Sequence, residues 1–218
     1  MPRVAVILSG CGFQDGAEIQ EAVVALMALD EAGAAVACFA PDKAQLQSTN
    51  HRTGKPSGET RNVLIESARI ARGRIQDLAD AKADDFDAVL LPGGFGAALN
   101  LCDFGVNGSD CKVDPSVERF LTEMRDANKP IAALCIAPVI VASLFGATGV
   151  RVTIGNDRDT AAAIERMGAK HVDCSVSDAV VDESHRVATT PAYMLAKSPK
   201  ELRSGIEKCV KEMLRMCK

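Results

Sequence analysis

The sequence predicts an α/β domain with a mainly parallel sheet, and two observations lead to this fold class. Short apolar segments, such as 3–8, 34–40 and 87–91, alternate along the chain with segments that have the helical spacing of about 3.6 residues. These apolar segments are almost uninterrupted by polar residues, which is typical of strands buried on both faces. Strands that alternate with helices in this way form a parallel sheet with helices packed on both sides.

The expected elements follow one another along the whole chain, so we expect a single domain over residues 1–218. Gly33 ends the first helix and Pro115 stands at the first position of a later one, where each residue type is favoured. Two polar stretches, 43–60 and 97–113, are expected to be long loops, and such loops inside a compact domain are usually functional. Further strands are expected at 130–134, 151–154, 178–182 and 186–189, and helices at 17–32, 61–71, 114–128, 136–145, 160–167 and 199–216.

The composition excludes several classes of protein. With 47% hydrophobic and 25% charged residues, the 218-residue chain can bury a substantial core. Its net charge is −4, and it has no Trp, one Tyr and no basic run with interleaved aromatics, so nucleic acid is not an expected partner. No stretch approaches the roughly 18 uninterrupted apolar residues of a membrane span, so we expect no membrane partner.

The eight cysteines are interpreted as free thiols. The chain is too long and too apolar to need disulfides, and it has neither a C-x-x-C motif nor a Cys/His spacing typical of zinc. We therefore expect a reducing compartment, no metal and no cofactor. Because Met1-Pro2-Arg3 leads straight into an apolar strand, the expected location is the cytoplasm, or an organelle matrix if a presequence has been removed.

Cys135 is the strongest candidate for a reactive residue. It directly follows the expected strand 130–134 and precedes a helix that Pro138 begins, which is the arrangement of a nucleophile on a sharp strand-to-helix elbow. The N–H groups and the positive dipole end of that helix favour a thiolate and lower the thiol pKa from about 8.5 toward 7 or below. An inert cysteine in a buried strand remains the alternative.

Two further features lie at the same edge of the predicted sheet. Glu18 falls in the first turn of the first helix, after the glycine-rich loop 9–16, and its simplest alternative role is to complement the helix dipole. Pro92-Gly93-Gly94 follows the strand at 87–91, and its glycines let backbone N–H groups point inward as an oxyanion hole requires. Carboxyl ends of parallel strands share one edge, so these features are expected to converge on Cys135.

Six motifs, in order over nearly the whole chain, resemble the ElbB branch of the ThiJ/PfpI superfamily, which is also described as class I glutamine amidotransferase-like. They are Ile7–Gly12, Asp15–Ile19, Phe39–Asp42, Pro92–Ala97, Cys135–Pro138 and Thr189–Met194. The resemblance implies a flavodoxin-like three-layer sandwich, often a homodimer. It implies Cys135 as nucleophile, Glu18 as the pocket carboxylate, and the N–H groups of Gly94 and Ile136 as oxyanion donors. Further candidates for the pocket are Cys11, Gly12, Gly93, His51 and Thr190.

The resemblance also implies a reaction. Some ElbB-type proteins are described as cofactor-independent glyoxalases that convert methylglyoxal to lactate, and older descriptions link the branch to isoprenoid biosynthesis. We therefore expect a small α-oxoaldehyde as substrate, bound to Cys135 as a hemithioacetal while Glu18 moves a proton between adjacent carbons. The same chemistry converts glyoxal to glycolate.

Other functions are weighed against this one. Amidotransferase and protease chemistry need a histidine beside the cysteine, but Ile136 follows Cys135, and His171 and His185 are expected to be structural and solvated, respectively. His51, in the loop at 43–60, is the histidine that could reach the site. Gly10-Cys11-Gly12 imitates a dinucleotide fingerprint, but Asp15 stands where the third glycine belongs. A non-catalytic, redox-sensing Cys135 on the same fold remains open.

The two long loops complete the expected site. Residues 43–60 and 97–113 are expected to rim the pocket of Cys135 or to cover it from a partner subunit. Cys102 and Cys111 lie in the second loop and are expected to be exposed.

Overall fold

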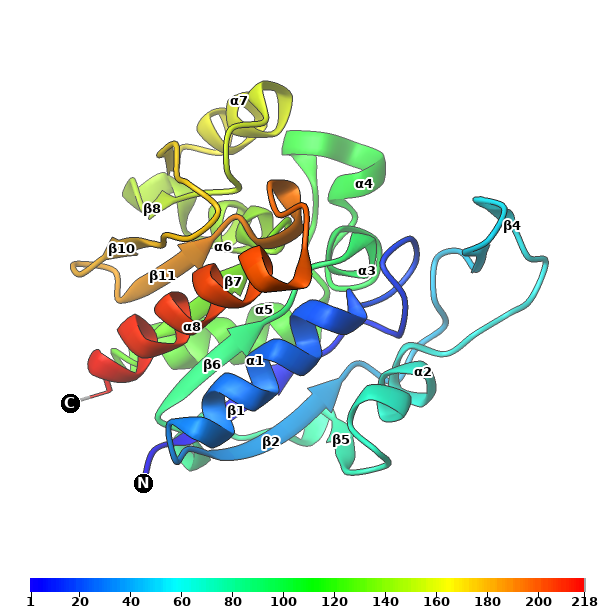
Figure 1. Ribbon diagram of the computed structural model, residues 1–218, viewed down its shortest axis with the longest axis horizontal. Coiled ribbons are helices and arrows are strands. Elements are labelled where there is room, and N and C mark those ends of the chain that lie inside the picture. The colour runs from blue at the N-terminus through cyan, green and yellow to red at the C-terminus, as the bar shows by residue number, and fades with distance from the viewer. Residues whose placement is uncertain (218) are drawn as a thin grey trace.

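Residues 1–217 are described by the computed structural model, and their centre is a seven-stranded sheet. Its order is β10-β11-β7-β6-β1-β2-β5, and all neighbours are parallel except the antiparallel pair β10–β11. The predicted three-layer α/β fold with a mostly parallel sheet is confirmed (Figure 1). The strands are β1 (Arg3–Ile7), β2 (Ala35–Ala40), β5 (Ile75–Asp77), β6 (Ala88–Leu91), β7 (Ile131–Leu134), β10 (Val180–Asp182) and β11 (Val187–Thr190).

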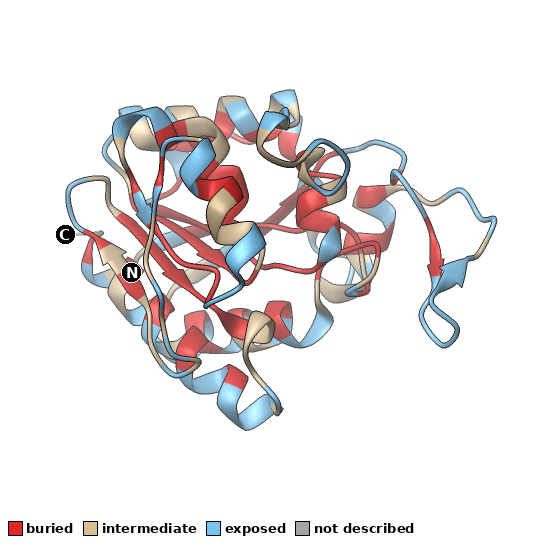
Figure 2. Ribbon diagram, turned by 90° about the horizontal axis from the view of Figure 1, so that it is seen from above, coloured by how far each residue is buried: buried red, intermediate tan, exposed pale blue. Residues whose placement is uncertain are grey.

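Helices cover both faces of the sheet, as Figure 2 shows by the buried strands between exposed outer helices. Along β1, Val4 and Val6 face the cluster built with α1 and α8, whereas Ala5 and Ile7 face the cluster built with α5 and α6. None of the helices in the described part of the chain has the length and apolarity needed to cross a membrane. The helices are α1 (Ile19–Glu31), α2 (Val63–Ile70), α3 (Phe95–Leu99), α4 (Phe104–Asn107), α5 (Pro115–Asp126), α6 (Pro138–Phe145), α7 (Arg158–Arg166) and α8 (Pro199–Arg215).

Two parts of the sheet differ from the prediction. The segment expected as a strand at 151–154 forms only β8 (Arg151–Val152), which pairs with β9 (Lys170–His171) in a separate two-stranded sheet. The edge strand β5 was not predicted, because its three residues are only half-buried or exposed and carry no apolar run. Short strands of this kind lack the periodicity on which the prediction rests.

The two expected loops have different structures. Residues 43–60 hold the hairpin of β3 (Thr49–Asn50) and β4 (Lys55–Pro56), which projects from the body of the molecule (Figure 1). Residues 97–113 are not a long irregular loop, since they contain the end of α3, all of α4 and a 3-10 turn at Gly108–Asp110. The prediction missed these elements because helices of four or five residues are too short to show a helical period.

Candidate active site

The backbone at Cys135 makes the predicted elbow between β7 and α6. Cys135 has φ +58°, a left-handed conformation that costs a non-glycine residue about 1–2 kcal/mol. Its N–H donates to the carbonyl of Thr190 at 3.0 Å, and the N–H of Ala137 donates to the carbonyl of Leu134 at 2.9 Å. These bonds hold the strained turn at the carboxyl edge of the sheet and leave the thiol at the start of a helix.

Gly93 lets the neighbouring loop come close to this elbow. A Cβ at this position would lie 2.4 Å from the Cβ of Cys135 and 2.8 Å from a carboxyl oxygen of Glu21, so no side chain fits. Gly94 has φ +92°, and a Cβ there would lie 2.4 Å from the backbone N of Glu18. The predicted convergence of the Pro-Gly-Gly turn, the first helix and the cysteine is therefore present in the structure.

The carboxyl group that contacts the thiol belongs to Glu21, which is fully buried. One of its oxygens accepts the N–H of Gly93 at 2.9 Å, and the other accepts the N–H of Tyr193 at 3.1 Å. Burial raises the pKa of Glu21 to about 7, although these N–H groups and the hydrogen bond with Cys135 act in the opposite direction. A carboxyl with such a pKa can hold or release a proton near neutral pH.

Glu18 has a different position from the one expected of the pocket carboxylate. Its carboxyl oxygen accepts the N–H of Glu21 at 2.6 Å and so caps α1, while its own N–H donates to the carbonyl of Gly93 at 2.9 Å. Partial burial raises its pKa. Glu18 lines the wall of the cavity above Cys135, but the contact with the sulfur is made by Glu21, one helical turn later.

The helical pattern of α1 contains the signal that identifies Glu21. The buried face of the helix consists of Ala22, Ala25, Ala28 and Leu29, and Glu21 falls on this face because it precedes Ala25 by four residues and Ala28 by seven. A carboxyl group on the apolar face of a helix is expensive to bury unless it is paired or protonated. Glu18 was the expected residue because it lies in the first turn of the helix, just after the glycine-rich loop.

The environment of Cys135 disfavours the thiolate while Glu21 is ionised. Burial, followed by the negative charge of Glu21, raises the pKa of the thiol well above its usual value, against the N–H groups of Gly94 and Ile136 that point at the sulfur. The expected lowering of the thiol pKa toward 7 is therefore wrong for this charge state. Because the carboxyl and the thiol are in contact, their protons titrate as a pair, and a proton on Glu21 is the condition for a thiolate.

A cavity of about 480 Å³ opens above the sulfur. Cys135 is 7% exposed, so the thiol can be reached at its floor but is shielded from bulk water. The wall is mostly apolar, with a few polar groups that can orient a small ligand. Its lining includes Phe13, Phe95, Phe104 and Met194 together with Glu18, Asp157, Thr160 and Tyr193.

The other predicted pocket residues divide into two groups. Thr190 supports the elbow through its carbonyl, and its hydroxyl donates to the carbonyl of Asp178 at 2.7 Å. Cys11, Gly12 and His51 do not line the cavity above Cys135. They lie around the loop that follows β1, away from the sulfur, because this loop turns back on itself with the N–H of Gly12 bonded to the carbonyl of Ala17 at 2.9 Å.

All three histidines fall within residues 1–217, and none lines the cavity above Cys135. His51 packs edge-on against Phe13, a residue of the cavity wall, with ring centres 5.5 Å apart. The side chain of His171 is 5% exposed, in agreement with a structural role. His185 is not simply solvated, because its Nδ1 lies 2.8 Å from a carboxyl oxygen of Asp182.

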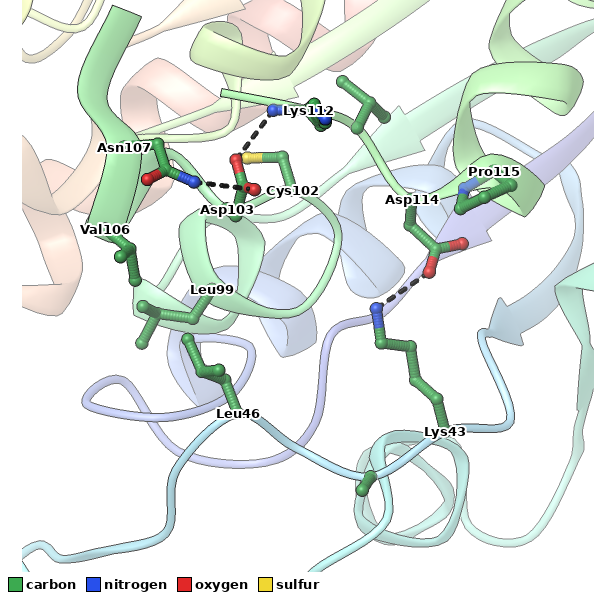
Figure 3. A pocket seen from close by; sticks show the side chains of 12 residues that line it. Lys43, Leu46, Leu99, Cys102, Asp103, Val106, Asn107, Lys112, Asp114 and Pro115 are labelled. Carbon is green, nitrogen blue, oxygen red and sulfur yellow. Dashed lines mark hydrogen bonds and ion pairs between the residues drawn. The ribbon is translucent and has the colours of Figure 1, made fainter. Parts of the chain in front are cut away.

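One of the two long segments contributes to the cavity, as predicted. Ala98, Phe104 and Gly105 of the segment 97–113 belong to its wall. The hairpin segment 43–60 contributes no lining residue from this chain. Its first residues, Lys43 and Leu46, instead line a neighbouring cavity of about 450 Å³ (Figure 3).

Comparisons with known proteins agree with this architecture. A human protein named glutamine amidotransferase-like class 1 domain-containing protein 3, mitochondrial, is 48% identical over 224 residues, covering 98% of this chain and 83% of the human protein. The ES1 protein, mitochondrial, of Danio rerio is 34% identical, covering 98% of this chain and 86% of the fish protein. The solved structure of an isoprenoid biosynthesis protein with an amidotransferase-like domain from Ehrlichia chaffeensis superposes with a TM-score of 0.93 at 38% identity, covering 100% of both chains.

The sequence pattern of one family extends over most of the chain. It matches residues 3–197, which run from the first strand to the end of the segment after β11 and include the whole candidate site. The chain therefore belongs to the DJ-1/PfpI family, the class I glutamine amidotransferase-like superfamily that its motifs resemble.

Proposed function

We propose that this protein is a cofactor-independent enzyme that converts small α-oxoaldehydes to hydroxy acids, methylglyoxal to lactate and glyoxal to glycolate. The observation that carries the proposal is the buried pair of Cys135 and Glu21 at the floor of a small, mostly apolar cavity. The pair offers a nucleophile and a carboxyl group whose pKa of about 7 suits proton transfer. The volume of about 480 Å³ suits a small substrate.

The reaction begins with addition of the sulfur to the aldehyde carbon. With the proton on Glu21, Cys135 attacks as a thiolate, and Glu21 gives its proton to the aldehyde oxygen, which completes a hemithioacetal. The N–H groups of Gly94 and Ile136, which point at the sulfur, are close to the developing oxyanion. In other enzymes a donor of this kind contributes about 10²–10³ in rate.

A proton then moves between the two adjacent carbons. Glu21, now ionised, removes a proton from the carbon that carries the sulfur, giving an enediolate. The hydroxyl proton then passes to the neighbouring oxygen, and Glu21 returns its proton to the neighbouring carbon to give a thioester. Water hydrolyses the thioester, which releases the hydroxy acid and restores the thiol, so the net reaction adds one water to the substrate. Glu18, on the wall, is placed to orient the substrate hydroxyl.

The decisive experiment measures lactate from methylglyoxal in the absence of glutathione. Cys135→Ala should abolish turnover, while Cys38→Ala, which removes another buried thiol in β2, should leave it intact. Equal turnover in wild type and Cys135→Ala would overturn the mechanism. We expect no glutaminase activity, because none of the three histidines reaches the cavity.

A redox-sensing role for Cys135 is the second candidate, and the same sulfur environment supports it. A protonated Glu21 and the N–H groups of Gly94 and Ile136 are donors that can stabilise a sulfinate as well as an oxyanion. Oxidation of Cys135 by peroxide, seen by mass spectrometry in protein that turns over no α-oxoaldehyde, is the result expected of a sensor. Turnover that depends on Cys135 is the result expected of the enzyme.

The location, the branch and the assembly are further parts of the proposal. Relatives from human, rat and Danio rerio are named as mitochondrial proteins, so we propose a mitochondrial location for this chain rather than the cytoplasm. We propose the ElbB branch on a different ground, the six motifs that resemble it. We also propose a homodimer, because Ile19, Val23 and Met27 form an apolar stripe on α1 that is 37–49% exposed. Organelle fractionation tests the location, and light scattering tests the homodimer.

A further inference from the structure

Two cysteines outside the cavity are brought together by the segment 97–113. Cys102 follows α3 and Cys111 follows the 3-10 turn at Gly108–Asp110, and the sequence places them nine residues apart. Cys102 forms an antiparallel bridge with Val113, which brings the two ends of the segment side by side. In this arrangement Cys102 and Cys111 lie on the same side of the paired backbone segments, close enough for each thiol to shift the pKa of the other.

The closeness of the two thiols does not depend on their own contact. The N–H of Asp103 donates to the carbonyl of Lys112 at 3.1 Å, and the N–H of Lys112 donates to the carboxyl of Asp103 at 2.7 Å. The other carboxyl oxygen of Asp103 accepts the side-chain amide of Asn107 at 2.9 Å (Figure 3). A bond between the sulfurs therefore closes a loop whose two ends are already joined by backbone and side-chain hydrogen bonds.

The two thiols differ in exposure and in acidity. Cys111 is half-buried, whereas Cys102 is 4% exposed and donates its S–H to the carbonyl of Ala97 at 3.3 Å, from which rotation of the S–H turns it toward Cys111. The hydrogen bond from Cys102 lowers the pKa of Cys111 to about 7, against the effect of partial burial. The half-buried Cys111 is thus the better nucleophile, whereas the buried Cys102 stays protonated.

We propose that Cys102 and Cys111 form a modification site of their own, at which hydroperoxides convert the two thiols to an intrachain disulfide. The thiolate of Cys111 attacks the O–O bond of the peroxide, which gives a sulfenic acid on Cys111 and releases water or an alcohol. The thiol of Cys102 then attacks that sulfur, forming the disulfide and releasing water. Two thiols lose two electrons and two protons, and the peroxide accepts them. A dithiol reductant reverses the step by exchange.

The disulfide has a consequence for the cavity above Cys135. Phe104 and Gly105, which line that cavity, lie between the two cysteines. Oxidation encloses them in a short covalent ring, which restricts the movement of this part of the wall.

The test uses the tryptic peptide of residues 83–112, which contains Cys102 and Cys111 and no other cysteine. After one equivalent of hydrogen peroxide, this peptide should lose about 2 Da and resist alkylation until a dithiol is added. Cys135→Ala protein should behave as wild type does, which separates this site from the proposed enzyme. Cys174→Ser is the matched control, because it removes a half-buried thiol elsewhere and should change nothing.

Single variants test the order of events. Cys102→Ala should trap Cys111 as a sulfenic acid that dimedone labels, and should slow alkylation of Cys111 at pH 7 by about tenfold, since it removes the S–H donor. Cys111→Ala should leave Cys102 reduced at the same dose. A wild-type peptide that keeps two alkylatable thiols while Cys135 or Cys174 is oxidised would overturn the proposal, as would sulfenic acid formation at Cys102.

Discussion

The sulfur of Cys135 and the sulfur of Cys111 both accept hydrogen bonds, yet their pKa values move in opposite directions. At Cys135, burial and the negative charge of Glu21 raise the pKa, whereas at Cys111 the neutral thiol of Cys102 lowers it to about 7. A neutral thiol can donate a hydrogen bond to a thiolate without a change in its own charge, whereas a carboxyl neighbour can do so only when it is protonated. Cys135 therefore depends on the protonation of its partner, and Cys111 does not.

The largest effect expected from this comparison is on turnover. Glu21→Gln keeps a donor beside the sulfur but removes the proton acceptor, so kcat/KM for methylglyoxal should fall by about 10²–10⁴. Glu18→Gln keeps an oxygen to cap α1 and should lower kcat/KM by about tenfold at most. A larger loss of kcat/KM in Glu18→Gln than in Glu21→Gln would show that Glu18 is the acid–base residue.

The next effect is on the pH dependence of stability. The pKa of Glu21 is about 7 in the folded chain against 4.5 in the unfolded chain, so the folded state keeps a proton that the unfolded state releases. The stability that Glu21 contributes is therefore fully present below pH 4.5 and is lost as pH rises through 7, by about 3 kcal/mol. Glu21→Gln should lack this fall. The free energy of unfolding of the variant relative to wild type, measured in urea, should therefore be higher at pH 8 than at pH 5. The exposed Glu165→Gln should show no such trend.

A smaller effect tests the close approach of the Pro-Gly-Gly turn. Gly93→Ala places a methyl group 2.4 Å from the Cβ of Cys135 and should lower the free energy of unfolding by about 1–3 kcal/mol. Gly58→Ala is the control, because no atom lies within 4 Å of its Cβ and only its φ of +75° disfavours alanine, by about 1 kcal/mol. Cys135 should also become easier to alkylate in Gly93→Ala, since the displaced turn uncovers it. Equal losses of stability in the two variants would contradict the described packing.

The smallest effect compares the two thiols in one protein. Glu21→Gln removes the charge beside Cys135, so alkylation of Cys135 at pH 7 should speed up by about tenfold. The rate at Cys111 should stay the same and serves as an internal control. If both rates changed together, the variant would have opened the structure rather than changed one pKa.

The elbow and its surroundings could be predicted because each has a local signal. Apolar runs mark β1, β6 and β7, Pro138 marks the start of α6, and the glycines at 93 and 94 mark a close approach. These signals also predicted Cys135 as the reactive residue and the carboxyl edge of the sheet as the place of the site. The family resemblance added the three-layer arrangement.

The parts that could not be predicted depend on contacts between distant residues. Glu21 carries a helical signal, but its partners Gly93 and Tyr193 lie 72 and 172 residues away along the chain. The pairing of Cys102 with Cys111 depends on short turns between them, which have no periodicity to recognise. The pKa of Cys135 is raised because the thiol is buried and lies beside the charge of Glu21. Sequence spacing predicts neither the burial nor this neighbour.

The left-handed backbone at Cys135 has a consequence for how this protein can change over evolutionary time. Glycine tolerates φ +58° without strain, so a chain with glycine at this position would be more stable than one with alanine, and one with valine or threonine would be the least stable. A lineage that no longer used the thiol would therefore drift toward glycine. Cysteine at position 135 of a descendant sequence is for this reason a marker that the sulfur is still in use.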